Sequence, residues 1–319
     1  MHVRRNSHRL LAATAVVALA IGLAGCGTSD DNKTATSSSG GDKGHVTISG
    51  QNFPEATLVA DMYDELLDHA GYDVTVKLVG TRDVYMAKGQ FPGSIDVVPE
   101  YLGGVADYLN TLANGSNAKP VSSPDVDKTL QAAQKLANAK GITLLTPSEA
   151  TDANAFFVTK KYAQANNLTD LSSLKGKSVV LAAAADCKGR TDCAGGLEQT
   201  YGIKISKVLG LGFATDQTYQ SVLKGESQLG ETSTTDGSLD AQGLQLLPDD
   251  QGIQPAQNLL PAVSTAFLAK HPDVKTILDK LSAVLTTDDL VKLNGEIGNE
   301  RKKPADVAED YLKSKGLLD

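Results

Sequence analysis

The chain has 319 residues, a formal net charge of −8 at pH 7, and 41% hydrophobic against 21% charged residues. This length allows one large domain or two lobes, each with its own core. No Lys/Arg-rich stretch or basic helix face follows the first nine residues, which argues against nucleic acid as a partner. The acidity is typical of a solubilising surface.

The first 25 residues have the pattern of an export signal. Arg4, Arg5 and Arg9 precede an apolar run over residues 10–23, and the run closes on Leu23-Ala-Gly-Cys26. A positive start, a short apolar run and small residues before a cleavage site are typical of a signal peptide. The run is shorter than the roughly 20 residues that span a bilayer, which disfavours the alternative of an uncleaved membrane helix.

The closing residues look like the lipobox of a bacterial lipoprotein. We therefore expect residues 1–25 to be the signal peptide and Cys26 to carry the lipid. The mature chain would work in the cell envelope, at the outer face of the cytoplasmic membrane. Residues 26–44 are rich in Ser, Thr, Gly and Asp and too polar to bury a core, so we expect a flexible tether.

The folded part is expected to start near His45, with a strand over residues 46–49. Pro54 then opens a helix that Gly71 ends, and its apolar residues recur at helical spacing: Leu58, Val59, Met62, Leu66 and Leu67. A strand over residues 72–79, a short helix from Thr81 and a strand over residues 95–98 follow. This alternation predicts a parallel-rich α/β sheet with crossover helices.

The alternation resumes after residue 150. Strands are expected over residues 156–159, 178–182 and 204–209, and helices over residues 196–201 and 215–225. From His271 the pattern is helical, with only residues 244–247 and 259–263 reading as further strands. We therefore expect the C-terminal helices to pack back on the first lobe.

These patterns predict two lobes joined by two chain crossings. Residues 45–150 plus 245–319 would form lobe 1, and residues 151–244 would form lobe 2. Two crossings make a hinge around a cleft, and ligands bind in such clefts of open α/β folds.

Two cysteines remain after Cys26 is set aside. Cys187 and Cys193 stand close together in a loop that contains glycine, and outside the cell such a pair reads as a disulfide, with two free thiols as the alternative. A metal site would need more ligands, and none of the five histidines lies near the pair: His2, His8, His45, His69 and His271.

Catalytic motifs are missing from the sequence. There is no G-x-S-x-G elbow, H-E-x-x-H pair or P-loop, and Gly210-Leu-Gly212 is too little for a dinucleotide fingerprint. No histidine has the context of a catalytic triad. We therefore expect no enzymatic activity and no cofactor.

Four motifs resemble one family. Gly50-Gln-Asn-Phe-Pro-Glu55, Ile95-Asp-Val-Val-Pro-Glu-Tyr-Leu-Gly103 and Thr234-Thr-Asp-Gly237 are similar to its S-K/Q-N-F-T-E, I-D-x-x-P-E-Y-T-G and T-D-G motifs. Arg190 and residues 196–202 match its R-x-D-G-x-x-G-L and Y-G run. The chain is identified as a member of the substrate-binding proteins of ABC importers for glycine betaine, carnitine and choline, over residues 45–319.

The resemblance implies a two-lobed periplasmic-binding-protein fold of type II. It implies a small-molecule solute, an ABC permease and its ATPase as partners, and a monomer that touches the membrane only through its lipid. In this family a trimethylammonium group is held by cation–π contacts with tyrosines, and a carboxylate by Arg, Lys or hydroxyl groups. Tyr101 matches one cage tyrosine, Arg190 matches the carboxylate arginine, and Gln51 stands at the Lys/Gln position.

The chain departs from this pattern at the other cage positions. Asn154, Ser233 and Gln257 replace tyrosines, Gly104 replaces a threonine, and Phe53 and Phe156 are expected in the core. Amide and hydroxyl groups suit a polar or zwitterionic solute with its own donors and acceptors. The expected ligand-binding residues are Gln51, Asn52, Tyr101, Asp152, Asn154, Arg190, Ser233, Thr234 and Gln257.

Alternatives remain at several positions. Tyr101 could be a packed aromatic at a helix start, Arg190 could pair with Asp186 or Asp192, and Asp236 could cap a turn. The whole chain could be a surface sensor or scavenging module without a transporter, or a plain glycine betaine or choline binder whose cage other residues complete.

Overall fold

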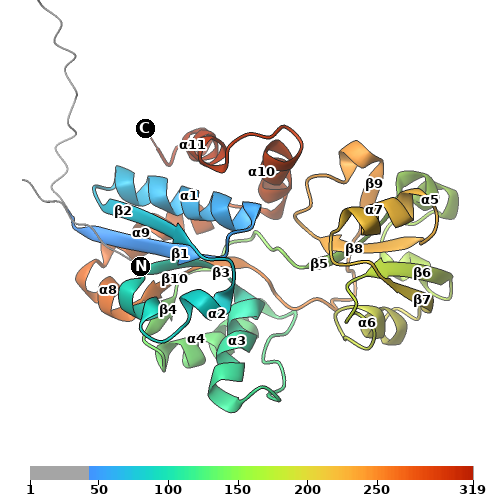
Figure 1. Cartoon of the computed structure of the whole chain (residues 1–319), viewed down its shortest axis with the longest axis horizontal. Coiled ribbons are helices and arrows are strands. Elements are labelled where there is room, and N and C mark those ends of the chain that lie inside the picture. The colour runs from blue at the N-terminus through green and yellow to red at the C-terminus, as the bar shows by residue number, and fades with distance from the viewer. Residues whose placement is uncertain (1–42, 319) are drawn as a thin grey trace, which may run out of the picture. The chain divides into compact units, whose positions relative to one another are not determined.

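The computed structural model describes residues 43–318. The expected signal peptide, Cys26 and the tether up to residue 42 lie outside the described residues. From residue 43 onward the chain forms two α/β lobes, each built on a five-stranded mixed sheet (Figure 1). Over the same residues, no helix combines the length and the apolar character that crossing a membrane requires.

The sheet of the first lobe has the strand order β2-β1-β3-β10-β4. Its first three strands are parallel, as the alternation predicts, and β10 runs antiparallel to both β3 and β4. The strands are β1 (His45–Gly50), β2 (Asp73–Leu78), β3 (Val97–Tyr101), β4 (Ile142–Leu144) and β10 (Leu259–Ser264).

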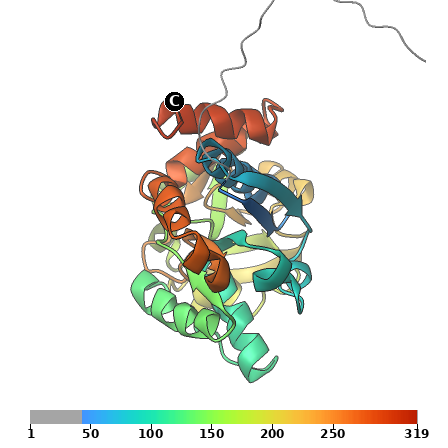
Figure 2. The same ribbon diagram turned by 90° about the vertical axis from the view of Figure 1, so that its left-hand side faces the viewer.

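Two groups of helices cover the two faces of this sheet (Figure 2). One group is α1 (Pro54–His69), α8 (Thr265–Lys270), α9 (Asp273–Ser282), α10 (Thr287–Gly298) and α11 (Pro304–Ser314). The other is α2 (Arg82–Tyr85), the helical turn Gln90–Ser94, α3 (Leu102–Asn114) and α4 (Val126–Asn138). The apolar side of α1 shares one core with α9, α10 and α11, so the C-terminal helices pack on the first lobe as predicted.

Local signals explain where α1 begins and ends. Pro54 occupies the first helical position, where its missing N–H costs no hydrogen bond. Gly71, just past the helix, has a φ of +95°, and this left-handed conformation favours glycine at a helix C-terminus. The helix therefore starts directly after residues 50–53 and carries Glu55 in its first turn.

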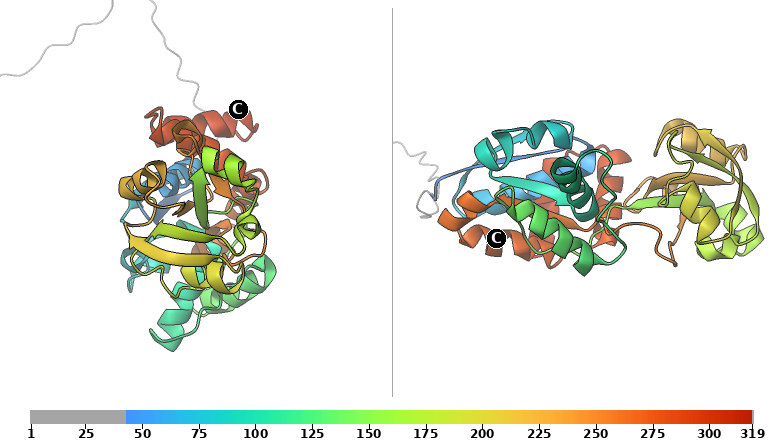
Figure 3. Two further views of the ribbon diagram at one scale, coloured as in Figure 1. Left: turned by 90° about the vertical axis from the view of Figure 1, so that its right-hand side faces the viewer. Right: turned by 90° about the horizontal axis from the view of Figure 1, so that it is seen from below.

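The sheet of the second lobe has the order β7-β6-β8-β5-β9. Its strands are β5 (Asn154–Thr159), β6 (Ser178–Ala183), β7 (Lys204–Gly210), β8 (Leu229–Ser233) and β9 (Leu244–Leu247). Because β9 pairs antiparallel with β5, residues 245–247 belong to this sheet and not to lobe 1. The expected boundary at residue 244 is therefore wrong by a few residues, and the chain returns to the first sheet between β9 and β10 (Figure 3).

The helices of the second lobe are α5 (Lys160–Asn166), α6 (Ala194–Gln199) and α7 (Asp216–Leu223), with helical turns at Leu171–Leu174 and Asp240–Gln242. Phe156 is buried in the core of this lobe, as predicted. Phe53 is not in a core: it is 36% exposed and lines a cavity.

The predicted disulfide is present. Cys187 and Cys193 are bonded and buried in the core of the second lobe, next to the start of α6. Their sulfurs lie within 4.8 Å of a carboxylate oxygen of Glu231. Since a thiolate is the form of cysteine that binds metals, bonded sulfurs do not turn this group into a metal site.

Candidate solute-binding site

A cavity with a volume of about 610 Å³ draws its lining from both lobes. We call it cavity 1. From the first lobe come Phe53, Pro54, Glu55, Asn294, Gly298 and Asn299; from the second come Phe213, Ala214, Tyr219, Thr232, Ser233, Thr235, Asp236, Gly237 and Ser238; Asp152 comes from the first crossing. Two of the predicted site residues, Asp152 and Ser233, lie here.

Glu55 is a hydrogen-bond acceptor that lines cavity 1 from the first lobe. It is only 5% exposed, and its Oε1 accepts from the hydroxyl of Tyr101 at 2.8 Å while its Oε2 accepts from Nδ2 of Asn294 at 2.6 Å. Both oxygens of Glu55 therefore act as hydrogen-bond acceptors. Burial and the charges of Glu55 and Asp152 raise the pKa of Tyr101 well above its usual value, so the phenol stays a neutral donor.

The ring of Tyr101 does not form an open aromatic face. It is buried at the start of α3, with Phe53 stacked on it at a centroid distance of 5.9 Å. The structure thus matches the alternative of a packed aromatic at a helix start. Tyr101 reaches cavity 1 through its hydroxyl bond to Glu55.

Asp152 stands beside Glu55 and contacts the second lobe. Its Oδ1 accepts from the hydroxyl of Thr235 at 3.0 Å. Burial, together with the negative charge of Glu55, raises the pKa of Asp152 to about 7. At pH 7, Asp152 is therefore about half protonated.

The predicted residues next to Asp152 and Ser233 along the chain face a different space. Asn154 and Thr234 line cavity 2, which has a volume of about 480 Å³. Thr234 turns away from Ser233 and Thr235, because successive side chains of an extended chain point to opposite sides. Thr234 links the turn after β8 to residues 151–153, since its hydroxyl donates to the carbonyl of Thr151 and accepts from the N–H of Ala153.

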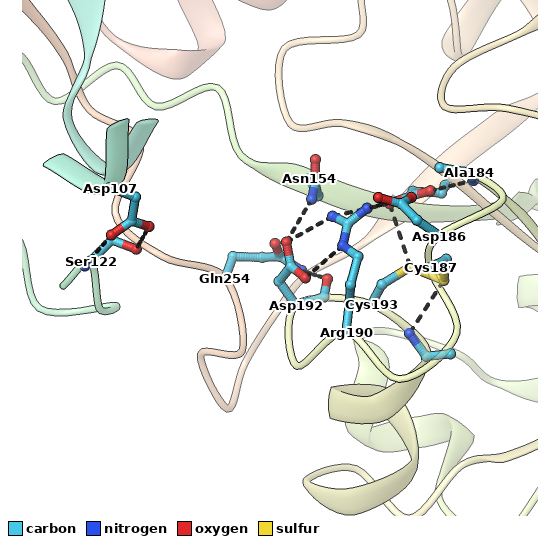
Figure 4. Close-up of polar contacts among 12 residues, drawn as sticks. Asp107, Ser122, Asn154, Ala184, Asp186, Cys187, Arg190, Asp192, Cys193 and Gln254 are labelled. Carbon is cyan, nitrogen blue, oxygen red and sulfur yellow. Dashed lines mark hydrogen bonds and ion pairs between the residues drawn. A yellow bond between two sulfur atoms is a disulfide. The ribbon is translucent and has the colours of Figure 1, made fainter. Parts of the chain in front are cut away.

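Arg190 is already paired (Figure 4). Its Nε and Nη2 donate to the two oxygens of Asp192 at 3.0 and 2.8 Å, and its Nη1 donates to Asp186 at 3.2 Å. Nη2 also lies 3.9 Å from Oε1 of the buried Glu231, and Asn154 donates to Asp192 at 3.1 Å. The structure thus matches the alternative in which Arg190 pairs with Asp186 and Asp192. Its guanidinium has no free pair of N–H groups that could bind a solute carboxylate.

The remaining predicted residues lie outside cavities 1 and 2. Oε1 of Gln257 accepts from the N–H of Gly104 at 3.0 Å, which satisfies a free donor at the start of α3. Gly104 leaves space for Arg82: a Cβ there would lie 2.9 Å from Nη2 of that residue. Gln51 is half-buried and Asn52 exposed, and neither lines either cavity.

Several residues of cavity 1 were not predicted. Glu55 lies within the first family motif, where its position after Pro54 also suits an ordinary acid in a first helical turn. Phe213, Tyr219 and Asn294 had no signal in the sequence. Asp236 is a turn cap, as one alternative held: it accepts from the N–H and hydroxyl of Ser238 and from the hydroxyl of Tyr219 at 2.7 Å.

Two mixed sheets, joined by two crossings and enclosing a cavity lined from both sides, define a two-lobed α/β periplasmic binding protein. Residues 44–314 match the family described as the substrate binding domain of ABC-type glycine betaine transport systems, and the chain belongs to this family. The resemblance found in the motifs is thereby confirmed. Its members are solute-binding proteins of transporters rather than enzymes.

Individual relatives cover most of the chain. It is 28% identical over 283 residues to the glycine betaine-binding protein YehZ of Escherichia coli, covering 85% of this chain and 90% of the relative. It is 25% identical over 285 residues to a glycine-betaine-binding protein of Pseudomonas aeruginosa, covering 86% and 89%. The solved structure of apo YehZ superposes with a TM-score of 0.71 at 27% identity, covering 86% of this chain and 99% of that one.

Proposed function

We propose that this chain is the extracytoplasmic solute-binding lipoprotein of an ABC importer and that it captures a small organic ammonium solute. Cavity 1 carries this proposal. Its walls hold the carboxyl groups of Glu55, Asp152 and Asp236, and no Lys, Arg or His is among the described residues that line it. A cation in such a space gains favourable electrostatic energy that an anion would lose.

The chemistry of the relatives is consistent with this choice. They are named for glycine betaine and carnitine, both of which carry a quaternary ammonium group. Cavity 1 of this chain provides carboxyl groups that attract the positive group. Arg190, the expected partner of a solute carboxylate, is already paired with Asp192 and Asp186. A solute carboxylate would therefore have to displace an existing ion pair, and this disfavours anions and betaines.

Capture would proceed by lobe closure. A solute in cavity 1 meets residues of both lobes, so it stabilises the arrangement in which the two walls are closest. The closed form is the one that we expect the permease to bind. Affinity for the solute and delivery to the importer are linked through this population shift.

Calorimetry with a small panel of solutes tests the ligand class. At pH 8, ethanolamine or choline is expected to bind, and succinate is not. Glycine betaine is expected to bind weakly, with a dissociation constant above roughly 100 μM (about −5.5 kcal/mol). Asp152→Asn is expected to weaken ammonium binding at least tenfold, because it removes a negative charge next to the solute.

Glu226→Gln is the matched control for that variant, since Glu226 is exposed on the turn after α7 and removing its charge is expected to leave binding unchanged. Tight binding of succinate, or the absence of binding by every ammonium compound, would contradict the proposed ligand class. Micromolar binding of glycine betaine would instead favour a plain betaine binder, with Phe53, Phe213 and Tyr219 completing an aromatic site.

Anchoring would depend on Cys26, which lies outside the described residues. The wild-type chain, expressed with its first 25 residues, is expected to incorporate labelled fatty acid and to enter the detergent phase on phase separation. Cys26→Ser is expected to do neither, because the lipid is attached to that sulfur. Lipid labelling of the Ser variant would show that Cys26 is not the anchor.

A further inference from the structure

The two carboxyl groups at the first-lobe wall of cavity 1, Glu55 and Asp152, act as hydrogen-bond acceptors. Glu55 uses both oxygens as acceptors, and Asp152 accepts from Thr235. Glu55 is also one of the causes of the raised pKa of Asp152, which indicates that the two carboxyl groups lie close together.

A second observation concerns Asn294, which lines the same cavity. Its Nδ2 donates to Glu55 and to the carbonyl of Thr235. Its Oδ1 is buried, and no described residue donates a hydrogen bond to it. A buried acceptor without a donor is costly, and a solute N–H group that reached Oδ1 as the lobes close would remove this cost.

Two of the three aromatic side chains that line the cavity, Phe53 and Tyr219, pack against another ring, and the third, Phe213, is 42% exposed. Phe53 stacks on Tyr101 at a centroid distance of 5.9 Å, and Tyr219 packs against Phe157 at 5.2 Å. A trimethylammonium group is held by several open faces around one point, and it cannot donate a hydrogen bond. The arrangement of acceptors and covered rings suits a different cation.

We infer that the solute is an ammonium with N–H donors, a primary or secondary amine, which binds at the Glu55–Asp152 pair in place of the proton on Asp152. This inference rests on the proposed function and specifies its substrate class. The amine donates N–H bonds to both carboxylates, and the displaced proton leaves to water. Charge is conserved, since one monocation replaces one proton.

The pH dependence follows from the groups that face the pair. These are the neutral phenol of Tyr101 from β3, the neutral amide of Asn294 from α10, and Asp236 from the turn after β8. Because burial and Glu55 raise the pKa of Asp152 to about 7, Asp152 holds a proton below this pH and loses it above this pH. Amine affinity should therefore fall as the pH drops from 8 to 6, by up to about tenfold for each pH unit below 7.

An N-methylation series tests the substrate class directly. Ethanolamine, N,N-dimethylethanolamine and choline keep one positive charge and one hydroxyl group while the number of N–H donors falls from three to one to none. Calorimetry at pH 8 is expected to show affinity falling along the series, by at least about tenfold between ethanolamine and choline. Equal or tighter binding of choline would overturn the inference and leave the proposed capture of an organic cation intact.

Proton release gives a second, independent readout. Titrations with ethanolamine at pH 7, in two buffers with different heats of ionisation, are expected to show release of about half a proton, because Asp152 is then half protonated. Release should be near zero at pH 8.5 and in Asp152→Asn, whereas Glu226→Gln should behave as wild type. Absence of proton exchange in the wild type, with binding intact, would overturn the inference. Failure of every ammonium compound to bind would instead reject the proposed function.

Discussion

Replacing Glu100 by alanine is expected to lower the free energy of unfolding by about 3–5 kcal/mol. Glu100 is completely buried at the end of β3, where it accepts from Nε and Nη2 of Arg82 at 3.0 and 2.8 Å and from the hydroxyl of Tyr85 at 2.6 Å. The alanine would leave a guanidinium that is mostly buried without a counter-charge. Urea unfolding followed by circular dichroism measures the loss.

Two further variants separate the charge from the packing. Glu226→Ala, at an exposed position, is expected to stay within about 0.5 kcal/mol of wild type. The double variant Arg82→Met with Glu100→Leu is expected to recover most of the loss, because a buried ion pair replaced by apolar groups is often neutral. A loss below about 1 kcal/mol in Glu100→Ala would show that Arg82 finds water or another acid.

Gly237→Val is expected to weaken amine capture at least tenfold (about 1.4 kcal/mol). Gly237 lies in the turn after β8, and an added Cβ would stand 2.3 Å from the carbonyl oxygen of Val291 and 2.4 Å from the nitrogen of Gly295, both backbone atoms of α10. The turn would have to leave the helix. That movement would break the bond from Nδ2 of Asn294 to the carbonyl of Thr235 and displace the amide that also holds Glu55.

This variant should remain folded, with a limited loss of stability. Overpacking at one contact costs about 1–3 kcal/mol, and both sheets keep their cores. Gly93→Ala serves as the control, since its added methyl would meet nothing within 4 Å and should leave binding unchanged. Wild-type affinity in Gly237→Val, measured by calorimetry with ethanolamine, would show that contact between this turn and α10 does not shape the cavity.

The sequence predicted the elements whose ends carry local signals. Pro54 and Gly71 bound α1 as expected, and the apolar spacing of the C-terminal helices indicated that they needed a partner, which α1 provides. The sheet that receives β9 could not be predicted, because the apolar residues of a strand do not identify its neighbour. Only the pairing with β5 assigns residues 245–247 to the second lobe.

The site was predicted where a motif and the fold agree. Asp152 and Ser233 line cavity 1, and Tyr101 contacts it through Glu55. The state of Arg190 could not be predicted, since it depends on how the loop turns Asp192 and Asp186 toward the guanidinium. Asn294 is 239 residues from Glu55 along the chain, and no local pattern reveals such a contact.

The distance between the lobes, measured with and without solute, tests the central claim most directly. Spin labels on cysteines introduced at Lys88 in the first lobe and Lys161 in the second, both exposed, report this distance by pulsed electron resonance. Saturating ethanolamine is expected to shift the distribution to a shorter and narrower distance, because the solute contacts both walls of cavity 1. The same titration with succinate should leave it unchanged. A distribution that does not move, while calorimetry shows ethanolamine bound, would contradict capture by lobe closure.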